Sequence, residues 1–358
     1  MSRIGILGGG QLGRMLALAG HPLDHSFVIL TPHADAPAAP MAETIIADYD
    51  DPAALAELAE RCDVVTYEFE NVPNAAVVAL TPKVPVRPGG RALTVASDRL
   101  AEKEMFQQLG IPTAPFVPVD VAADMEPALE KTGLAAVLKT RRMGYDGRGQ
   151  RVLRQPDDVH GAFTGLGAVP LLLEGFVDFR RELSIIAVRS IEGETAFYPL
   201  VENRHEGGIL RYSRAPAPRL DPAQQKQAEA YATKVLEELG YVGVLALELF
   251  DDGEQLLANE IAPRVHNSGH WTIEGAETSQ FENHLRAITG APLGSCAARG
   301  ESGMINLIGD APDALSIQAI PGANLHLYGK APRPGRKLGH VTVTAPDQAT
   351  LDARVEQL

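Results

Sequence analysis

Two glutamates, Glu248 and Glu260, lie on opposite arms of a predicted β-hairpin. Residues 244–250 and 255–261 have strand-like sequences, and the segment 251–253, Asp-Asp-Gly, is a strong turn signal between them. Such a turn can bring both carboxylates onto one face, where they would suit Mg²⁺, which binds few protein carboxylates together with phosphate oxygens. The metal would neutralise charge on a transferred phosphoryl group. Because two glutamates on a hairpin are more often a solvated face, the metal interpretation depends on the residues around them.

A polar run directly after the hairpin favours the metal interpretation. Asn259 offers a neutral oxygen donor beside Glu260, and the chain continues as Ala262-Pro-Arg-Val-His-Asn-Ser-Gly-His-Trp271. Arg264 in this run can hold a carboxylate or a phosphate through two parallel hydrogen bonds. An ordinary strand end does not carry so many directional polar side chains.

A loop rich in glycine and arginine follows a predicted strand that ends at Lys139. Residues 140–150 read Thr-Arg-Arg-Met-Gly-Tyr-Asp-Gly-Arg-Gly-Gln, which places three glycines within six residues and adds three arginines. This composition is typical of a mobile lid that folds over phosphates and excludes water. The alternative is an ordinary basic hairpin turn, which would not need this combination. The Walker pattern G-x-x-x-x-G-K-[ST] occurs nowhere in the chain.

A glycine loop near the N-terminus satisfies G-x-G-x-x-G with Gly8, Gly10 and Gly13, between a predicted strand and a predicted helix. Such a loop can bind a phosphate through backbone N–H groups. NAD binding would require an acidic residue at the end of the second strand, which instead reads Ile29-Leu30-Thr31. We therefore favour phosphate binding slightly over simple strand–helix packing, and both over NAD.

A basic loop near the C-terminus crowds Lys330, Arg333, Arg336 and Lys337 into eight residues of an otherwise acidic chain. Prolines and a glycine stiffen it, and its charge suits a phosphate monoester. A solvated basic loop is an equal alternative on composition alone.

The elements that must position these residues fall into three stretches. The first hundred residues alternate strand and helix, which predicts a doubly wound parallel sheet. The middle of the chain predicts an α+β region with antiparallel sheet, and the last stretch, from about residue 300, is again strand-like. Strands are expected at residues 4–7, 27–30, 64–67, 135–139, 151–153, 171–174, 183–189, 196–201, 244–250, 255–261, 324–328 and 340–343. Helices are expected at residues 11–19, from 51–52 onward, at 97–109 and at 221–239.

Composition limits the classes of function. A chain of 358 residues with 45% hydrophobic and 22% charged residues is globular and suits two or three domains. The net charge of −14 argues against nucleic acid and anionic membrane as partners. The two cysteines, Cys62 and Cys296, form no C-x-x-C motif and suit a reducing compartment. The start of the chain does not read as a signal peptide, and we expect a cytoplasmic protein.

Taken in order, these motifs resemble the N5-carboxyaminoimidazole ribonucleotide synthetases, a family of ATP-grasp ligases. The glycine loop alone is a weak signal, whereas the ordered set is specific, and the segments around Tyr67 and Trp271 separate this family from other ATP-grasp ligases. The resemblance extends from residue 5 to residue 340. It is carried by Gly8-Gly-Gly-Gln-Leu-Gly-Arg14, Thr66-Tyr-Glu-Phe-Glu-Asn71, Lys139 with Gly144-Tyr-Asp-Gly-Arg-Gly-Gln150, Asn259-Glu-Ile-Ala-Pro-Arg264, His266-Asn-Ser-Gly-His-Trp271, and Arg333-Pro-Gly-Arg-Lys337 with Gly339-His340.

The resemblance implies an α/β and α+β architecture, the ATP-grasp fold, in three domains. These are a doubly wound N-terminal domain (1–96), an ATP-grasp domain (97–298, with 97–180 as central and lid part and 181–298 as catalytic body) and a small β-rich C-terminal domain (299–358). The implied reaction uses ATP and Mg²⁺. ATP phosphorylates bicarbonate to carboxyphosphate, and the amine of 5-aminoimidazole ribonucleotide takes the carboxyl group, releasing ADP and phosphate. A homodimer is the implied assembly.

The same resemblance assigns roles to individual residues. The residues implied for ATP are Arg99, Lys139, Gly144, Tyr145, Asp146, Gly147, Arg148, Gly149, Gln150, Glu174, Gly175, Phe176, Val177, Glu182, His205, Asn259 and Glu260. The implied magnesium ligands are Glu248 and Glu260. Carboxyphosphate and the amine would be positioned by Tyr145, Asp146, Arg148, Arg264, His266 and Asn267. The ribonucleotide would be held by Gly10, Gln11, Leu12, Glu70, Arg336 and Lys337.

Two residues depart from the family's pattern, and three other functions compete with it. Met143 stands where the family often has glycine, and Val265 where it often has proline, but neither change removes a chemical group. A sister ATP-grasp enzyme, such as the formate-dependent glycinamide ribonucleotide transformylase, would share the fold and differ in its acid and amine. A nicotinamide-dependent dehydrogenase lacks the expected strand-end carboxylate. A non-catalytic nucleotide-binding module would not need Lys139 together with Glu248 and Glu260.

Overall fold

A parallel sheet begins the chain, as the alternating pattern predicts. The computed structural model describes residues 1–144 and 147–358. The four N-terminal strands have the order β3-β2-β1-β4 and are all parallel. Asp51 caps the helix expected from residues 51–52 onward: its side chain accepts hydrogen bonds from the N–H groups of Ala53 and Ala54 at the start of α2. The elements are β1 (Arg3–Leu7), α1 (Gln11–Gly20), β2 (Ser26–Thr31), β3 (Glu43–Ile46), α2 (Pro52–Arg61), β4 (Val64–Tyr67), α3 (Asn74–Leu80) and α4 (Gly90–Ala96).

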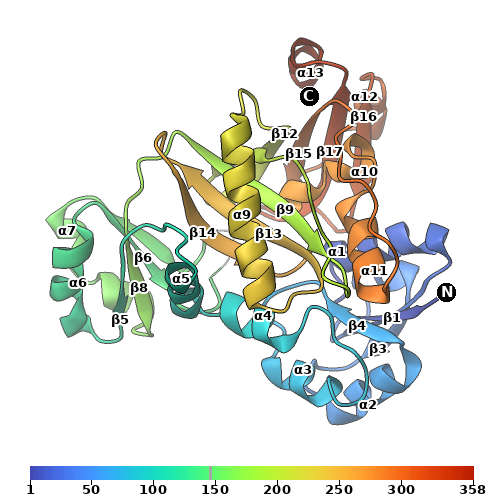
Figure 1. Cartoon of the computed structure of the whole chain (residues 1–358), viewed down its shortest axis with the longest axis horizontal. Coiled ribbons are helices and arrows are strands. Elements are labelled where there is room, and N and C mark those ends of the chain that lie inside the picture. Colours follow the sequence, from blue (N-terminus) through green and yellow to red (C-terminus); the bar gives the residue numbers. More distant parts are fainter. Residues whose placement is uncertain (145–146) are drawn as a thin grey trace.

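A separate four-stranded lobe follows, with the order β5-β8-β6-β7 and antiparallel pairing throughout. Figure 1 shows this lobe projecting to one side, with α6 and α7 on its outer face. The helix α5 connects it to the N-terminal region, and it begins two residues later than the sequence predicts. The elements are α5 (Arg99–Gln108), β5 (Phe116–Val119), α6 (Met125–Thr132), β6 (Ala136–Thr140), β7 (Gln150–Leu153), α7 (Pro156–Val159), α8 (Ala162–Gly165) and β8 (Leu171–Gly175).

The rest of the chain builds one large antiparallel sheet with the order β14-β13-β9-β11-β12-β15-β17-β16, and β10 pairs with β9. The long helix α9 crosses one face of this sheet and contacts β9 and β14 (Figure 1). The elements are β9 (Arg181–Arg189), β10 (Thr195–Phe197), β11 (Val201–Glu206), β12 (Ile209–Ala215), α9 (Pro222–Glu238), β13 (Gly243–Asp251), β14 (Leu256–Ala262), α10 (Thr272–Gly275), α11 (Gln280–Thr289), β15 (Glu301–Ile308), α12 (Ala314–Gln318), β16 (Ala323–Leu327), β17 (Lys337–Ala345) and α13 (Gln348–Val355). Short 3₁₀ turns occur at His21–Leu23, Ala39–Met41, Ala122–Asp124 and Asn267–Gly269.

Two differences from the predicted elements have physical causes. The single strand expected at residues 196–201 is wrong, because the chain leaves the sheet around Pro199, which has no N–H to donate, and forms β10 and β11 instead. The C-terminal strands β15, β17 and β16 do not form a sheet of their own. They extend the large sheet, since β15 pairs with β12.

A continuous apolar core joins the N-terminal sheet to the large sheet. Ile4 and Leu16 of the N-terminal region belong to the same buried cluster as Phe281 and Leu285 of α11. The buried Thr66 hydroxyl and the His284 Nε2 atom, 2.9 Å apart, add a polar contact. This core fixes the ends of β1 and β4 against the hairpin β13–β14. Within the described residues, none of the helices combines the length and the apolar character that crossing a membrane requires.

Candidate active site

A cavity of about 910 Å³ lies where the N-terminal region, the large sheet and the C-terminal loop meet. The glycine loop, the end of β4, the start of α5, the hairpin β13–β14 and the C-terminal basic loop all contribute to its wall. The fold therefore brings side chains from both ends of the chain to one place. The predicted site residues on the wall are Gly10, Gln11, Leu12, Glu70, Arg99, Gly144, His205, Glu248, Glu260, Arg264, His266, Asn267, Arg336 and Lys337.

A second group of predicted site residues lies behind or beside the wall. Most of them belong to the four-stranded lobe, at the ends of β6, β7 and β8. The Arg154 guanidinium lies 5.3 Å from the centre of the half-exposed Phe176 ring in this lobe. Within residues 1–144 and 147–358, the predicted residues that do not line the cavity are Lys139, Gly147, Arg148, Gly149, Gln150, Glu174, Gly175, Phe176, Val177, Glu182 and Asn259. Tyr145 and Asp146 lie outside the described residues.

The structure confirms the predicted hairpin. In it, Glu248 and Glu260, the two carboxylates expected to bind metal, lie opposite each other. Glu248 is the register partner of Glu260, and a bulge follows Glu248. Each carboxylate contacts a neighbouring side chain: Arg99 Nη1 is 2.7 Å from Glu260 Oε2, and His266 Nε2 is 3.1 Å from Glu248 Oε1. Burial acts to raise the pKa of Glu260, but the Arg99 guanidinium outweighs it and lowers that pKa to about 2. Glu260 is therefore an anion at neutral pH.

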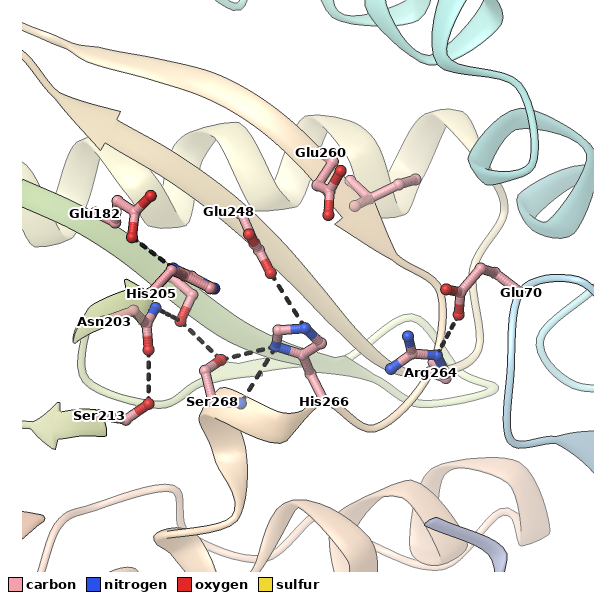
Figure 2. A network of polar contacts seen from close by, with 12 residues as sticks. Glu70, Glu182, Asn203, His205, Ser213, Glu248, Glu260, Arg264, His266 and Ser268 are labelled. Carbon is pink, nitrogen blue, oxygen red and sulfur yellow. Dashed lines mark hydrogen bonds and ion pairs between the residues drawn. The ribbon is translucent and has the colours of Figure 1, made fainter. Parts of the chain in front are cut away.

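A chain of hydrogen bonds fixes the imidazole of His266. The hydroxyl of Ser213 donates to Asn203, whose amide donates to Ser184, whose hydroxyl donates to Ser268, over distances of 2.7, 2.9 and 2.8 Å. Ser268 Oγ then lies 2.9 Å from His266 Nδ1, and the Ser268 N–H donates to the same nitrogen. Figure 2 shows this chain leading from the sheet to the cavity wall. Because Nδ1 accepts, Nε2 carries the proton, and it lies 3.1 Å from Glu248 Oε1.

The donor set around the carboxylate pair fits Mg²⁺. Asn259 Oδ1, next to Glu260 in the chain, is buried without a hydrogen-bond partner, and so is the Asn267 amide on the cavity wall. In the part of the chain that the structure describes, no group of three or more His, Cys, Asp or Glu side chains gathers as a metal cage. Two carboxylates with neutral oxygen donors match the preference of Mg²⁺ for few protein ligands, with phosphate and water completing the octahedron.

A buried lysine pair flanks the carboxylate of Glu174. Lys139 Nζ is 3.0 Å from Glu174 Oε1, and Lys103 Nζ is 3.2 Å from Glu174 Oε2. All three residues are less than a tenth exposed. Burial acts to raise the pKa of Glu174, but the two ammonium groups lower it to about 2. Burial lowers the pKa of Lys139, against the opposing effect of Glu174. The group keeps one net positive charge beside the lid loop.

Two further pairs join predicted site residues from different elements. Arg264 Nε donates to Glu70 Oε2 over 2.6 Å, which connects the segment after the hairpin to the loop after β4. Burial acts to raise the pKa of Glu70, but Arg264 lowers it below its ordinary value. On β9 and β11, Glu182 and His205 share a hydrogen bond (Figure 2). Burial acts to lower the pKa of His205, whereas the carboxylates of Glu182 and Glu248 raise it overall.

The N-terminal glycine loop does not present free donors at two of its glycines. The carboxylate of the buried Glu68 accepts hydrogen bonds from the N–H groups of Gly10 and Gly13, the latter over 2.7 Å. Gln11 in the same loop accepts a 2.6 Å hydrogen bond from Lys330 of the C-terminal basic loop. The expectation that these N–H groups bind a ligand phosphate is wrong for this structure, because a side chain of the protein already fills that place.

Some residues of the site were assigned no role from the sequence. Glu68 carried no role although it lies within a quoted motif, and Lys103 carried none although it lies four residues after Arg99 in α5. Glu102 accepts a 2.6 Å hydrogen bond from the N–H of Ile261, next to Glu260. The ends of β2 and β3 carried no signal of chemistry, yet they place further polar side chains on the cavity wall: Thr31, His33, Asp35 and Tyr49.

The two departures from the family's pattern have different settings. Met143 is exposed and has a φ of 62°, a conformation that glycine adopts more easily. The family's preference for glycine at this position therefore has a backbone cause. Val265 is almost fully buried beside Arg264 and His266, so its role is packing.

Comparison with known families assigns each region of the chain. Residues 1–97 match the ribonucleotide synthetase preATP-grasp domain, residues 104–281 the ATP-grasp domain, and residues 302–354 the phosphoribosylaminoimidazole carboxylase C-terminal domain. The fold is that of the ATP-grasp class.

Relatives narrow this class to one family. An N5-carboxyaminoimidazole ribonucleotide synthase from Pseudomonas aeruginosa is 55% identical over 99% of this chain and 98% of its own length. The crystal structure of the corresponding synthetase from Thermus thermophilus has a TM-score of 0.96 at 56% identity and covers 99% and 97% of the two chains. A synthase from Aspergillus clavatus, solved in complex with ADP and 5-aminoimidazole ribonucleotide, has a TM-score of 0.92 at 33% identity, over 99% and 96% of the chains. The chain belongs to the N5-carboxyaminoimidazole ribonucleotide synthase family of ATP-grasp ligases.

Proposed function

We propose that this protein uses ATP to join bicarbonate to the exocyclic amine of 5-aminoimidazole ribonucleotide, giving N5-carboxyaminoimidazole ribonucleotide, ADP and phosphate. The observation that carries the proposal is the cavity that combines the carboxylate pair Glu248 and Glu260 with Arg264 and the basic loop around Arg336. Membership of the synthase family, and the relative solved with ADP and 5-aminoimidazole ribonucleotide, support it.

ATP would lie between the four-stranded lobe and the hairpin β13–β14. The cations of Arg99 and Lys139 would contact its phosphates, and the lid, residues 144–150, would close over them. The segment 174–177 would line the adenine, and the remaining nucleotide contacts would be Glu182, His205, Asn259 and Glu260. Magnesium held by Glu248 and Glu260 would neutralise charge on the transferred phosphoryl group.

Bicarbonate and the amine would react on the other side of the carboxylate pair. A bicarbonate oxygen attacks the γ-phosphorus of ATP and displaces ADP. The resulting carboxyphosphate loses phosphate as the amine attacks its carbon and gives up a proton. Arg264 and the Nε2–H group of His266 would hold its anionic oxygens, with Asn267 beside them, and Tyr145, Asp146 and Arg148 of the lid would help to position carboxyphosphate and the amine. Because carboxyphosphate is short-lived in water, both steps need one closed cavity.

The ribonucleotide would occupy the end of the cavity that faces the N-terminal sheet. Gly10, Gln11, Leu12 and Glu70 would contact it there, and the cations Arg336 and Lys337 would hold its phosphate. We propose domain boundaries at residues 96/97 and 298/299. The homodimeric state, which the resemblance implies, and the cytoplasmic location stay predictions.

The test is ADP release by the purified protein with ATP, Mg²⁺ and bicarbonate, with and without 5-aminoimidazole ribonucleotide. We expect release to increase strongly with the ribonucleotide and to fail when bicarbonate is removed. A matched reaction replaces bicarbonate and this ribonucleotide with formate and glycinamide ribonucleotide. Activity in that reaction alone would refute the proposal and favour the sister transformylase.

A further inference from the structure

A buried carboxylate of the protein fills the glycine loop at the start of α1. The parallel strands β1 and β4 pair Leu7 with Tyr67, so the loop after β1 and the residue after β4 leave the sheet side by side. Glu68, the first residue after β4, is 7% exposed. Its two carboxylate oxygens accept hydrogen bonds from the N–H groups of Gly10 and Gly13. These are the donors with which such a loop ordinarily binds a phosphate.

The spacing of the glycines follows from the shape of this one side chain. A Cβ at Gly10 would lie 2.7 Å from Glu68 Oε1, and a Cβ at Gly13 would lie 3.3 Å from Glu68 Oε2. A Cβ at Gly8 would collide with the same side chain, and the φ of Gly8, 115°, also favours glycine. Gly9 has different neighbours, since its Cβ would lie 2.7 Å from that of Ala36. The G-x-G-x-x-G pattern here surrounds Glu68.

The surroundings of Glu68 oppose the effect of its burial. The N-terminus of a helix stabilises a negative charge through its N–H groups and its dipole. Burial raises the pKa of Glu68, while the Gly13 and Gly10 N–H groups and the cations of Lys330 and Arg264 act in the opposite direction. An external phosphate at this place would meet both a filled space and a carboxylate.

The segments that Glu68 connects both reach the proposed ribonucleotide site. Gln11 follows Gly10 and accepts a hydrogen bond from Lys330, which ties the glycine loop to the C-terminal basic loop. Glu70, two residues after Glu68, is held by Arg264. Loss of the Glu68 carboxylate would release the glycine loop from β4 and would shift Gln11 relative to Glu70.

We propose that Glu68 is a positioning residue: its carboxylate occupies the phosphate place at the N-terminus of α1 and fixes the loop of residues 9–12 as one wall of the ribonucleotide site. The phosphate of the ribonucleotide then binds at the basic loop and not at the glycine loop. This inference rests on the proposed function for its kinetic consequence, whereas the fit between Glu68 and the glycines stands without it.

The fit is tested by a double-mutant cycle on thermal stability, with Glu68→Ala, Gly10→Ala and the double variant. Gly10 has an ordinary φ of −78°, so its substitution creates no backbone strain, and the three atoms nearest to an added Cβ all belong to Glu68; the cost of alanine at the start of α1 is the same in both backgrounds and cancels in the cycle. We expect Gly10→Ala to lower the Tm of the wild type by at least about 3 °C, and to have less than half that effect in the Glu68→Ala background. Gly9→Ala is the matched control, and its effect should be the same in both backgrounds. Equal effects of Gly10→Ala in both backgrounds would overturn the proposal.

The kinetic arm measures ADP release by Glu68→Ala and Glu68→Gln. We expect the KM for 5-aminoimidazole ribonucleotide to rise at least tenfold and the KM for ATP to stay within twofold, which a general loss of structure would not produce. An unchanged KM for the ribonucleotide, or an equal rise in both constants, would refute the positioning role. Should the wild type itself show no response to the ribonucleotide, the proposed function fails, and the stability cycle alone decides whether Glu68 fills the loop. If Glu68→Ala does not fold, Glu68→Asp takes its place in the stability cycle, because the shorter side chain withdraws its oxygens from Gly10, and Glu68→Gln alone serves in the kinetic arm, because its amide places an N–H group against an N–H donor.

Discussion

Replacement of Lys103 by methionine removes one of the two cations that contact Glu174. Lys103 is 1% exposed, and its Nζ atom is 3.2 Å from Glu174 Oε2 and 3.3 Å from the carbonyl oxygen of Ala258. Lys139 contacts the other oxygen of the same carboxylate at 3.0 Å. With both lysines present, the group has a net charge of +1 that is available to an anionic ligand. Without Lys103, Glu174 cancels the charge of Lys139.

The magnitudes follow from this arrangement. Removal of one partner from a buried ion pair typically costs about 3–5 kcal/mol of stability, and we expect about 2–3 kcal/mol here because Glu174 keeps Lys139. A hydrogen bond to a charged group contributes about 1.5–3 kcal/mol. Lys139 would lose a contribution of this size with a phosphate oxygen of ATP, because Glu174 then cancels its charge. Since each 1.4 kcal/mol is about a factor of ten, the KM for ATP should rise roughly tenfold to a hundredfold.

The assay is ADP release at saturating bicarbonate, ribonucleotide and Mg²⁺ with varied ATP, together with urea unfolding. Lys234→Met is the matched control, because Lys234 lies on α9 away from the cavity wall and its exposed ammonium group donates to the carbonyl oxygen of Leu109. We expect the control to leave the KM for ATP within twofold of the wild type. A Lys103→Met protein that loses stability but keeps the wild-type KM for ATP would refute the electrostatic reasoning and leave Lys103 with a packing role.

Three further predictions use other contacts of the site. Glu260→Gln should raise the Mg²⁺ concentration for half-maximal ADP release by about tenfold or more, and an unchanged Mg²⁺ titration would contradict the metal assignment. Arg264→Met leaves the partly buried Glu70 without its cation and should raise the KM for the ribonucleotide about tenfold or more in the ADP-release assay; a change in the KM for ATP alone would contradict this. For Glu102, burial and then the charge of Glu260 raise the pKa to about 8 from an ordinary 4.5, so the folded state holds a proton that the unfolded state releases. The stability that this raised pKa contributes is present below about pH 4.5 and is lost as the pH rises to about 8. Glu102→Gln should therefore lose less free energy of unfolding between pH 5 and pH 8 than the wild type, as measured by urea unfolding. Equal losses would contradict the pKa shift.

The parallel sheet and the hairpin could be predicted because their signals are local. Continuous apolar runs such as residues 4–7 and 27–30 mark strands that are buried on both faces. The turn at residues 251–253 fixes the hairpin, and the opposition of Glu248 and Glu260 follows from its register. The polar run after the hairpin is also local, and its Arg264 and His266 both reach the cavity.

The contacts between distant segments could not be read from patterns of this kind. The G-x-G-x-x-G loop has the same sequence whether its N–H groups bind a phosphate or Glu68, and only the pairing of β1 with β4 decides the outcome. Lys103 lies on an amphipathic helix, where a lysine ordinarily faces solvent. Its burial depends on the packing of α5 against β8 and β14, which brings Glu174 within reach.

The C-terminal region shows a third limit. The strands expected at residues 324–328 and 340–343 both form, as β16 and β17. Their sequence does not indicate which sheet they join. Through β15 they extend the large sheet at β12, so the basic loop between β16 and β17 is placed beside the glycine loop. The domain boundary that the family resemblance implies at about residue 300 therefore does not coincide with a boundary between sheets.

The most direct test of the central claim is the fate of bicarbonate oxygen. The protein is mixed with ATP, Mg²⁺, 5-aminoimidazole ribonucleotide and ¹⁸O-labelled bicarbonate for a time shorter than the exchange of bicarbonate oxygen with water, and the released phosphate is analysed by mass spectrometry. Activation through carboxyphosphate predicts one ¹⁸O atom in each phosphate released, because the attacking bicarbonate oxygen stays on phosphorus when the amine takes the carbon. Phosphate without label, released at the same rate as ADP, would contradict the account.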